Sequence, residues 1–395
     1  MANVFSIPRF VISGDNAMDF SVDYFKEMGS KALIVTDQAM VDLGNVKKLT
    51  SLMDSCNVSY YVYSEINTEP THTMIDNGVE LYKNEKCDFL VGIGGGSPLD
   101  AMKAIGAVYA NGGSITEYMG KKIEKDLPCM CAIPTTSGTG SEATKVSIIT
   151  NTDTNVKMLL NDPKLMVDYA ILDYTFTMTA PPSVTAATGV DALTHALEAY
   201  ASVKAFPLSD SFAVSALKRI YANLLDAFND GNNVEARKEM SLAAYEAGVA
   251  FTNASVTIIH GMSRPIGALF HVPHGMSNAM LLKTCLEFFK PAVIPELAEL
   301  ARAIGVYKEG MNDDKAADAF VAATISLLEP LNIKSPMDYG ITKEDFFKYI
   351  PKMAEDAMIS KSPLNTRRTP TKEDLMALYE KFWNDWEAIH NSRNS

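Results

Sequence analysis

The sequence predicts two domains: an α/β domain built on a parallel β-sheet, followed by an all-helical domain. At 395 residues, the chain is longer than one hydrophobic core usually holds. Before residue 181, short runs rich in Val, Ile and Leu alternate with helical stretches, which is typical of a parallel sheet covered on both faces. After the Pro181–Pro182 pair, long stretches rich in Ala, Leu, Met and Glu replace the β-rich runs. We therefore expect domains at 1–182 and 183–395.

The elements of the α/β half follow one another in a regular order. Each strand candidate is a β-rich run, and a helical segment follows most of them. The strand candidates are KALIVTD (31–37), SYYVYSEI (59–66), the start of 87–112 and LPCMCAIPTT (127–136), and the helical candidates are 38–55, 71–86 and the end of 87–112. In the second half, apolar residues recur at three-to-four spacing in 183–202, 210–228 and 237–253, which predicts amphipathic helices.

Composition and charge exclude several classes of protein. The chain has 35 basic and 48 acidic residues and a net charge of −13, which disfavours binding to nucleic acid and to anionic membranes. The five cysteines are scattered through apolar stretches, as expected for reduced, buried thiols. The first residues lack the pattern of a secretion signal, and no apolar run is long enough to span a bilayer. We expect a soluble, cytoplasmic protein.

A glycine-rich turn connects an apolar strand to a helix at Gly94-Gly95-Gly96-Ser97. Glycines allow backbone N–H groups to approach a diphosphate, and the helix that follows adds a partial positive charge. Pro98 suits the first helical turn. The turn departs from the usual G-x-G-x-x-G fingerprint, because Ser97 stands in place of the third glycine. On these residues alone, a tight structural turn is nearly as plausible as a nucleotide site.

Two neighbouring features favour the nucleotide site. The polar segment PTTSGTGSE (134–142) follows a strand and would suit a second phosphate or ribose contact, although a flexible loop explains it too. Asp37 closes the first strand candidate, at the edge where such sheets bind ligands. Its carboxylate could bind ribose hydroxyls and favour NAD over NADP, or it could cap the next helix.

A candidate metal site arises from the rarest polar side chains. In GVDALTHALEAY, Asp191 and His195 stand four residues apart on one helix face. Alone, this pair would more simply be part of an amphipathic helix. The chain has only six histidines, however, and three of them, His260, His271 and His274, lie close together in the sequence. Glycines and prolines surround them, so we expect a helix to end at His260 and the chain to turn there. One carboxylate and three imidazoles suit Fe(II), Zn or Mn. His271 remains as a group near the ligands or facing the substrate.

Taken together, these motifs resemble one family along essentially the whole chain: the group III iron-dependent alcohol dehydrogenases. GGGSPLDAMKA, PTTSGTGSE, GVDALTHALEAY and the HG…PHG block occur in the family's order and approximate spacing. The resemblance implies a dehydroquinate-synthase-like fold, with an N-terminal nucleotide domain and a helical metal domain, and a homodimer or larger oligomer. By motif, it also assigns site residues. The implied metal ligands are Asp191, His195, His260 and His274, and the implied NAD contacts are Asp37, Gly95, Gly96, Ser97, Asp100, Thr135, Thr136, Thr139 and Lys157.

One residue departs from the pattern of the family. Many members have a histidine, to which a proton-relay role has been given, at the position of Arg264. Arginine cannot relay protons at neutral pH but binds carboxylate or sulfonate through two hydrogen bonds. The alternative is a helix-terminal or surface arginine. Arg367 and Arg368 form a second basic pair, which could approach the active site or cap a helix.

The resemblance implies an NAD(H)-linked alcohol dehydrogenase or aldehyde reductase that uses Fe(II), with Zn or Mn as alternatives. Arg264 adds the expectation of a short anionic aldehyde, such as sulfoacetaldehyde or a semialdehyde acid. A neutral substrate, such as propanediol, butanol or lactaldehyde, is the alternative. More remote alternatives are a lyase of the dehydroquinate-synthase type and a non-enzymatic nucleotide or metal sensor. His271, water or a ribose hydroxyl would carry the proton.

Overall fold

A computed structural model describes residues 2–154 and 156–394, and the chain folds into two compact units. The sheet unit comprises Ser6–Ala180 and Gly231–Thr252. The helical unit comprises Pro181–Asp230 and Asn253–Ser395, together with the first five residues. One division therefore lies beside the domain boundary that we expect at residue 182. The segment Gly231–Thr252 returns to the sheet unit, so the simple cut at residue 182 stays a prediction.

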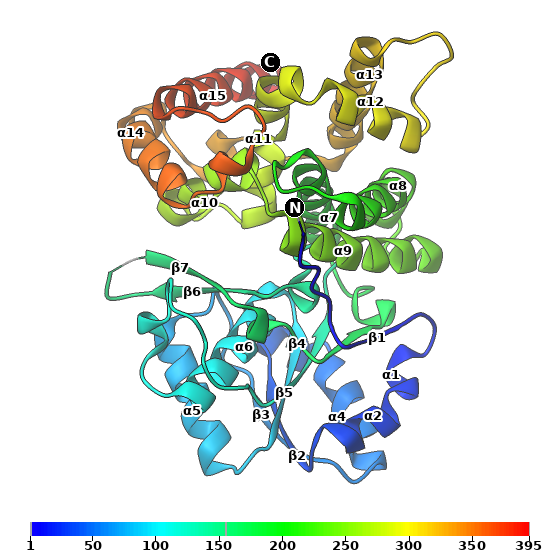
Figure 1. Ribbon diagram of the computed structural model, residues 1–395, viewed down its shortest axis with the longest axis vertical. Coiled ribbons are helices and arrows are strands. Elements are labelled where there is room, and N and C mark those ends of the chain that lie inside the picture. Colours follow the sequence, from blue (N-terminus) through cyan, green and yellow to red (C-terminus); the bar gives the residue numbers. More distant parts are fainter. Residues whose placement is uncertain (1, 155, 395) are drawn as a thin grey trace. The chain divides into compact units, whose positions relative to one another are not determined.

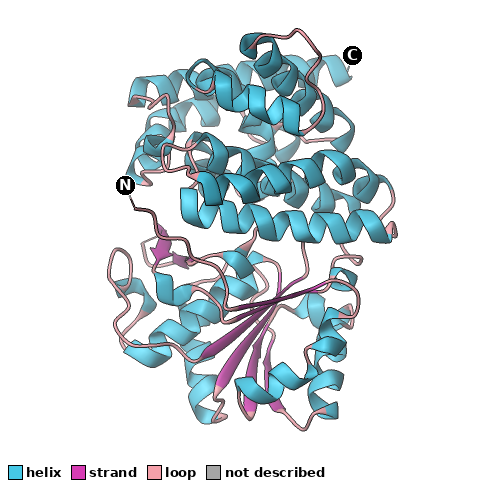
Figure 2. Ribbon diagram, turned by 45° about the vertical axis from the view of Figure 1, so that its right-hand side comes forward, coloured by secondary structure: helices cyan, strands magenta, loops and turns pink. Residues whose placement is uncertain are grey.

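The sheet unit is built on a parallel sheet, as the sequence predicts (Figures 1 and 2). Its described strands lie in the order β1-β8-β5-β4-β2-β3. Their bounds are β1 Phe10–Ser13, β2 Lys31–Val35, β3 Ser59–Tyr63, β4 Phe89–Gly94, β5 Cys129–Pro134 and β8 Tyr169–Leu172. A separate antiparallel pair, β6 Val146–Asn151 and β7 Val156–Asn161, has no counterpart in our expectations and directly follows the threonine-rich segment.

Helices cover both faces of this sheet (Figure 1). Along β2, Ala32 and Ile34 face the core formed with α1, α2 and α4. The alternate residues Leu33 and Val35, which point to the other face of the sheet, are fully buried as well. Burial on both faces explains why the strands read as continuous apolar runs. The helices of this unit are α1 Ala17–Phe20, α2 Val22–Met28, α3 Gln38–Asp42, α4 Asn45–Ser55, α5 His72–Asn84, α6 Gly96–Asn111 and most of α9 Val234–Ala254.

Helix α9 joins the sheet unit through a close approach of two glycines. A Cβ atom on Gly140, whose φ is +62°, would lie 2.6 Å from the Cα atom of Gly248. The backbone N–H of Lys145 also donates to Thr252 Oγ1 at 3.1 Å. A segment that is distant in sequence and purely helical in pattern therefore packs on the sheet unit.

In its described residues the helical unit contains helices and 3-10 turns but no strand, which confirms the expected helical half (Figure 2). Its long helices are α7 Pro182–Ala201, α8 Pro207–Asn229, α10 Ile258–Phe270, α11 His274–Phe289, α12 Ile294–Ala303, α13 Asp313–Leu328, α14 Lys343–Ile359 and α15 Lys372–Asn394. Helix α7 is buried along most of its length and packs against α8 and α11.

The expectation that a helix ends at His260 is wrong. Helix α10 begins at Ile258 and continues through Gly261 and Pro265 to Phe270. Gly261 is needed for packing rather than for a turn, because a Cβ atom there would lie 2.5 Å from Pro363 Cγ. His260 therefore lies in the first turn of a helix.

One stretch of the helical unit, Asp313–Tyr339, is long and apolar enough to resemble a membrane span by composition. It consists of α13 followed by two short 3-10 turns that contain Pro330 and Pro336. Ala316 and Phe320 of α13 are fully buried within the protein. Apolar helices of soluble proteins meet the same criterion, so this stretch is weak evidence for a membrane span.

Candidate metal centre and dinucleotide loops

Asp191 and His195 lie one turn apart on the buried face of α7. Helix α7 starts at Pro182, where the missing N–H of proline costs nothing, and continues over alanine-rich turns that allow close packing. Both side chains are almost completely buried, with 3% and 6% of their side-chain surface exposed. Two polar groups are placed here where an apolar core would otherwise form.

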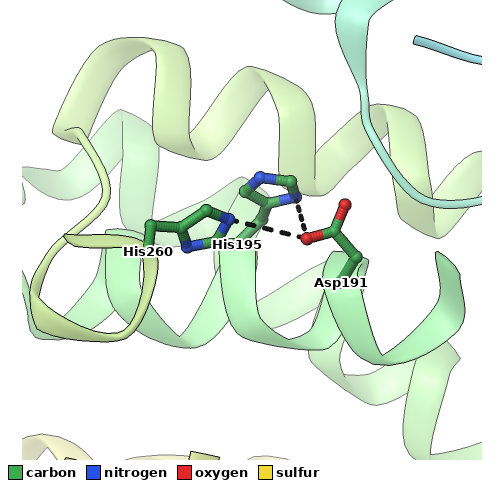
Figure 3. A group of neighbouring side chains, drawn as sticks. All are labelled: Asp191, His195 and His260. Carbon is green, nitrogen blue, oxygen red and sulfur yellow. Dashed lines mark ion pairs between the residues drawn. The ribbon is translucent and has the colours of Figure 1, made fainter. Parts of the chain in front are cut away.

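His260 and His274 reach the same point from two other helices. His260 lies in the first turn of α10, and His274 is the first residue of α11. From Asp191 Oδ1, the distances are 3.5 Å to His260 Nε2, 3.7 Å to His274 Nε2 and 4.0 Å to His195 Nδ1. Figure 3 shows Asp191, His195 and His260 converging. The ligand atoms of these three residues all lie within 4.8 Å of one another, close enough to hold one ion.

The charges at this point favour a cation. Burial alone would raise the pKa of Asp191, but the neighbouring imidazoles outweigh burial and hold that pKa well below its usual range. Burial also opposes protonation of His260, yet Glu198 and Asp191 outweigh it and raise its pKa. Loss of hydration is the largest influence that lowers the pKa of His274, which keeps a lone pair available at neutral pH. One ionised carboxylate and imidazole nitrogens form a donor set that first-row divalent ions prefer.

Two further buried residues contact the ligands, and sequence reasoning missed both. Glu198 Oε2 accepts a hydrogen bond from His260 Nδ1 at 2.5 Å. Asn278 Nδ2 donates to Asp191 Oδ1 at 2.7 Å and lies 3.1 Å from His260 Nε2. The spacing of each residue held a signal. Glu198 follows His195 by three residues on the same helix face, and Asn278 follows His274 by four.

The remaining predicted polar residues of the helical unit are not among the ligands. Arg264 lies on α10 one turn after His260, and its guanidinium donates to Ser362 Oγ at 2.8 Å. Its Nε is buried and has no hydrogen-bond partner in the described part of the chain. His271 is exposed and ends α10 with a left-handed φ of 55°.

The two other arginines are held elsewhere. Arg367 pairs with Glu296 at 2.6 Å, and Arg368 donates to the carbonyl of Phe288 at 2.8 Å. Their guanidinium groups are thus engaged outside the ligand cluster.

In the sheet unit, the predicted glycine turn connects β4 to α6. Gly94 has a φ of 150°, and a Cβ atom there would lie 2.7 Å from Pro98 Cγ. Gly95 is the N-cap of α6, and a Cβ atom on Gly96 would lie 3.1 Å from Thr139 Cγ2. Gly94 and Gly96 leave little room for a Cβ atom, and a glycine turn at the start of a helix suits the close approach of a diphosphate to backbone N–H groups.

The threonine-rich segment lies beside this turn. The N–H of Thr135 donates to the carbonyl of Gly94 at 3.0 Å, which joins the two loops. A Cβ atom on Gly95 would lie 3.7 Å from Thr136 Oγ1. The hydroxyls of Thr135 and Ser137 are buried and have no hydrogen-bond partner among the described residues. Buried polar groups usually have partners, so these hydroxyls are candidates for contact with a bound nucleotide.

The other predicted cofactor residues already have structural roles. Asp37 Oδ1 caps α3 by accepting from Met40 N at 2.9 Å, and its Oδ2 would lie 3.4 Å from a Cβ atom on Gly94. Both interpretations of Asp37 therefore remain compatible. Asp100 accepts from Ser141 Oγ at 2.6 Å and from Ile148 N at 2.9 Å, so it fixes the threonine-rich segment. Lys157 pairs with Glu69 at 2.7 Å, and Ser97 is the second residue of α6.

Comparison with known proteins relates both units to one family. The family model described as "Iron-containing alcohol dehydrogenase" matches residues 8–174, and that of the "Fe-containing alcohol dehydrogenase family, C-terminal" matches residues 185–383. The chain is 35% identical to lactaldehyde reductase of Escherichia coli (strain K12) over 390 residues, which covers 97% of this chain and 100% of the relative.

Solved structures extend the similarity to three dimensions. The structure of 1,3-propanediol oxidoreductase matches with a TM-score of 0.93 at 31% identity, covering 97% of this chain and 100% of the other. Sulfoacetaldehyde reductase from Bifidobacterium kashiwanohense in complex with NAD+ matches with a TM-score of 0.87 at 28% identity, covering 97% and 99%. The likeness therefore spans both units of the fold.

Proposed function

The chain belongs to the iron-containing alcohol dehydrogenase family, and on this basis we propose that it interconverts a short-chain aldehyde and its alcohol at the Asp191 cluster. It is a metal-dependent, NAD-linked alcohol dehydrogenase. One observation supports this location of the reaction above all others. Asp191, His195 and His260 bring one carboxylate and two imidazoles within 4.8 Å of one another in a buried place, and His274 adds a third imidazole.

Each part of the site has a task that its chemistry suits. A divalent cation held by the three imidazoles and Asp191 would act as a Lewis acid on the substrate oxygen, and NAD(H) would exchange the hydride. Asp191 supplies the negative charge that retains the cation. The Gly94–Gly96 turn and the hydroxyls of Thr135 and Ser137 offer donors to the cofactor, which fixes its position.

The test of this function is reversible removal of the metal. Protein stripped with a chelator should lose NADH-producing activity with short alcohols, and Fe(II) should restore it, with Zn or Mn as the next candidates. His260→Ala should lower both metal content and turnover. Full activity after complete removal of metal would refute the proposal. Binding of NAD without turnover of any alcohol or aldehyde would instead favour the sensor alternative.

We propose an anionic aldehyde as the substrate, because of Arg264. Arg264 lies one turn after His260 on α10, and its buried Nε has no hydrogen-bond partner in the described residues. Burial lowers the pKa of Arg264 from its usual value, but that value is so high that the group stays charged at neutral pH. A planar cation with a free donor beside the ligand cluster suits a carboxylate or sulfonate on the substrate.

Comparison of two substrates in one variant tests the charge of the substrate. Arg264→Ala should lower kcat/KM for sulfoacetaldehyde or a semialdehyde acid about 10- to 100-fold more than for a neutral aldehyde of similar size, because a charge-assisted hydrogen bond contributes roughly 1.5–3 kcal/mol. Arg368→Ala, which removes an arginine held by Phe288, is the matched control. Equal losses on both substrates would exclude an anionic substrate. The neutral alternative has its own support, since lactaldehyde reductase and 1,3-propanediol oxidoreductase are among the relatives.

The setting of the enzyme is also part of the proposal. We expect a cytoplasmic protein, because its composition is that of an acidic globular chain with few cysteines. We also expect a homodimer or larger homo-oligomer. Light scattering coupled to size-exclusion chromatography measures the mass directly, and a monomeric mass would contradict the second expectation.

A further inference from the structure

Glu198 is a carboxylate in a place where an ionised group is costly. It lies on α7, seven residues after Asp191, and its side chain is fully buried. Burying an ionised carboxylate is strongly unfavourable unless hydrogen bonds and opposite charge compensate for it. An apolar residue at this position would support helix packing without that cost. The carboxylate therefore calls for a specific explanation.

The hydrogen bonds of Glu198 all come from the start of α10. Its Oε1 accepts from Thr257 Oγ1 and from the backbone N–H of Ile259, each at 2.6 Å. Its Oε2 accepts from His260 Nδ1 at 2.5 Å. Thr257 is the N-cap residue of α10, so the carboxylate also meets the positive end of that helix. Both oxygens are satisfied, and all three donors belong to the segment that carries His260.

This arrangement determines which nitrogen of His260 can bind a metal. When the ring carries a single proton, on Nδ1 toward Glu198, the other ring nitrogen, Nε2, keeps its lone pair. That Nε2 is the atom that lies 3.5 Å from Asp191 Oδ1, on the side of the ligand cluster. A rotated ring, or a proton on Nε2, would remove one donor from the cluster. Hydrogen bonds of this kind to metal-bound imidazoles fix the tautomer and increase ligand basicity.

We propose that Glu198 is a positioning residue of the metal centre, which holds His260 with Nε2 directed at the cation and supplies a second negative charge beside it. The inference rests on the proposed metal site. Asp191 and Glu198 together carry two negative charges, which match a divalent ion in a buried environment. Replacing a residue in such a role typically lowers metal affinity about 10- to 100-fold, and we expect a loss of about that size here.

The experiment measures metal affinity directly in Glu198→Gln. Competition with a chromogenic chelator gives the dissociation constant for Zn²⁺, and the visible absorption of bound Co²⁺ reports ligand geometry. We expect Zn²⁺ affinity to fall about 10- to 100-fold, a shifted Co²⁺ spectrum, and NAD affinity unchanged. Thr257→Val is the matched control, since it removes one hydrogen bond of Glu198 without touching His260, and it should change metal affinity only a few-fold.

A double-mutant cycle shows whether Glu198 acts through His260. In a His260→Ala background, the additional Glu198→Gln change should lower metal affinity less than it does in the wild type, because the imidazole that it positions is gone and only the effect of its charge is left. Wild-type metal affinity in Glu198→Gln, or full additivity in the cycle, would overturn the inference. Absence of metal binding by the wild-type protein would instead refute the proposed function itself.

A measurement on the wild-type protein covers the case in which Glu198→Gln fails to fold. The chain has six histidines, so ¹⁵N-labelled imidazoles give a spectrum that His260→Ala can assign. With Zn²⁺ bound, His260 should carry its proton on Nδ1 and the metal on Nε2. Coordination through Nδ1 would contradict the proposed role of Glu198.

Discussion

The substitution Gly275→Ala tests whether the contact between α7 and α11 sets the geometry of the metal centre. Gly275 follows His274 in the first turn of α11. A Cβ atom on Gly275 would lie 2.3 Å from the carbonyl oxygen of Ala187 and 2.8 Å from its carbonyl carbon. Ala187 is on α7, and its carbonyl is the expected helical acceptor for the N–H of Asp191, four residues later. The added methyl group therefore presses on the backbone between two ligands.

The size of the effect follows from these distances. Because a Cβ atom essentially never approaches an oxygen within 3.0 Å, the two backbones must separate by about 0.7–1 Å. Metal–ligand distances tolerate only about ±0.2 Å, so His274 would move outside the range that one ion can bridge. Overpacking of this kind costs about 1–3 kcal/mol. If the helices relax apart in the metal-free protein and are strained only when metal is bound, that cost corresponds to a loss of metal affinity of roughly 5- to 150-fold.

Chelator competition measures the metal affinity, and thermal unfolding of metal-stripped protein separates it from a general loss of stability. The matched control is Gly106→Ala on α6, where the nearest atoms are Leu90 Cδ1 at 3.1 Å and Met130 Sδ at 3.4 Å. These are the ends of flexible side chains, so the control should fold and bind metal normally. If Gly275→Ala bound metal as tightly as wild type, the reasoning from backbone contact would be wrong.

Two further predictions concern buried ionisable groups of the sheet unit, and a third concerns the group that transfers the proton during the reaction. Lys103 is fully buried and donates to oxygens of Ser141, Thr144 and Val146. Lys103→Met should therefore destabilise the protein by about 3–5 kcal/mol in chemical denaturation, and it should weaken NAD binding without changing metal affinity. Unchanged NAD affinity would contradict this prediction. Burial raises the pKa of Glu142 from 4.5 to about 7, so the native state holds this proton more tightly than the unfolded chain does. The protonated side chain therefore adds up to about 3 kcal/mol to the free energy of unfolding below pH 4.5, and this contribution is lost as the pH rises through 7. Glu142→Gln should remove this pH dependence of the free energy of unfolding. If His271 relays the proton, His271→Gln should lower kcat at least about 100-fold and change its pH profile, whereas an unchanged profile would assign the relay to water or a ribose hydroxyl.

The parts of the fold that were predictable are those with a strong local pattern. Apolar runs such as 89–94 and 129–134 identify the central strands because burial on both faces leaves no polar residue in them. The short edge strand β1 has only one buried residue, Ile12, so its sequence does not stand out. The hairpin of β6 and β7 mixes polar and apolar residues, so no continuous apolar run identifies its strands in the sequence.

Other features depend on contacts between segments distant in sequence. Pro265 resembles a helix breaker, yet α10 continues through it because α10 packs against α11 and α14. The close approach of Gly140 and Gly248 assigns α9 to the sheet unit, and neither glycine signals this locally. The structure brings the predicted metal ligands together, but it surrounds them with groups that no histidine count could reveal.

The proposed metal centre would also hold helices of the helical unit to one another. Helix α7 supplies Asp191, His195 and Glu198, whereas α10 and α11 supply His260 and His274, so a bound cation would connect three helices. Without a cation, the buried carboxylates of Asp191 and Glu198 would face imidazoles, the amide of Asn278, and the Thr257 and Ile259 donors of α10. A ligand that binds only the folded state stabilises it by about 2.7 kcal/mol at 100 times its dissociation constant. If the cation binds as we propose, retaining it and keeping α7, α10 and α11 packed are one physical requirement, and this would account for the buried Asp191, Glu198 and Asn278.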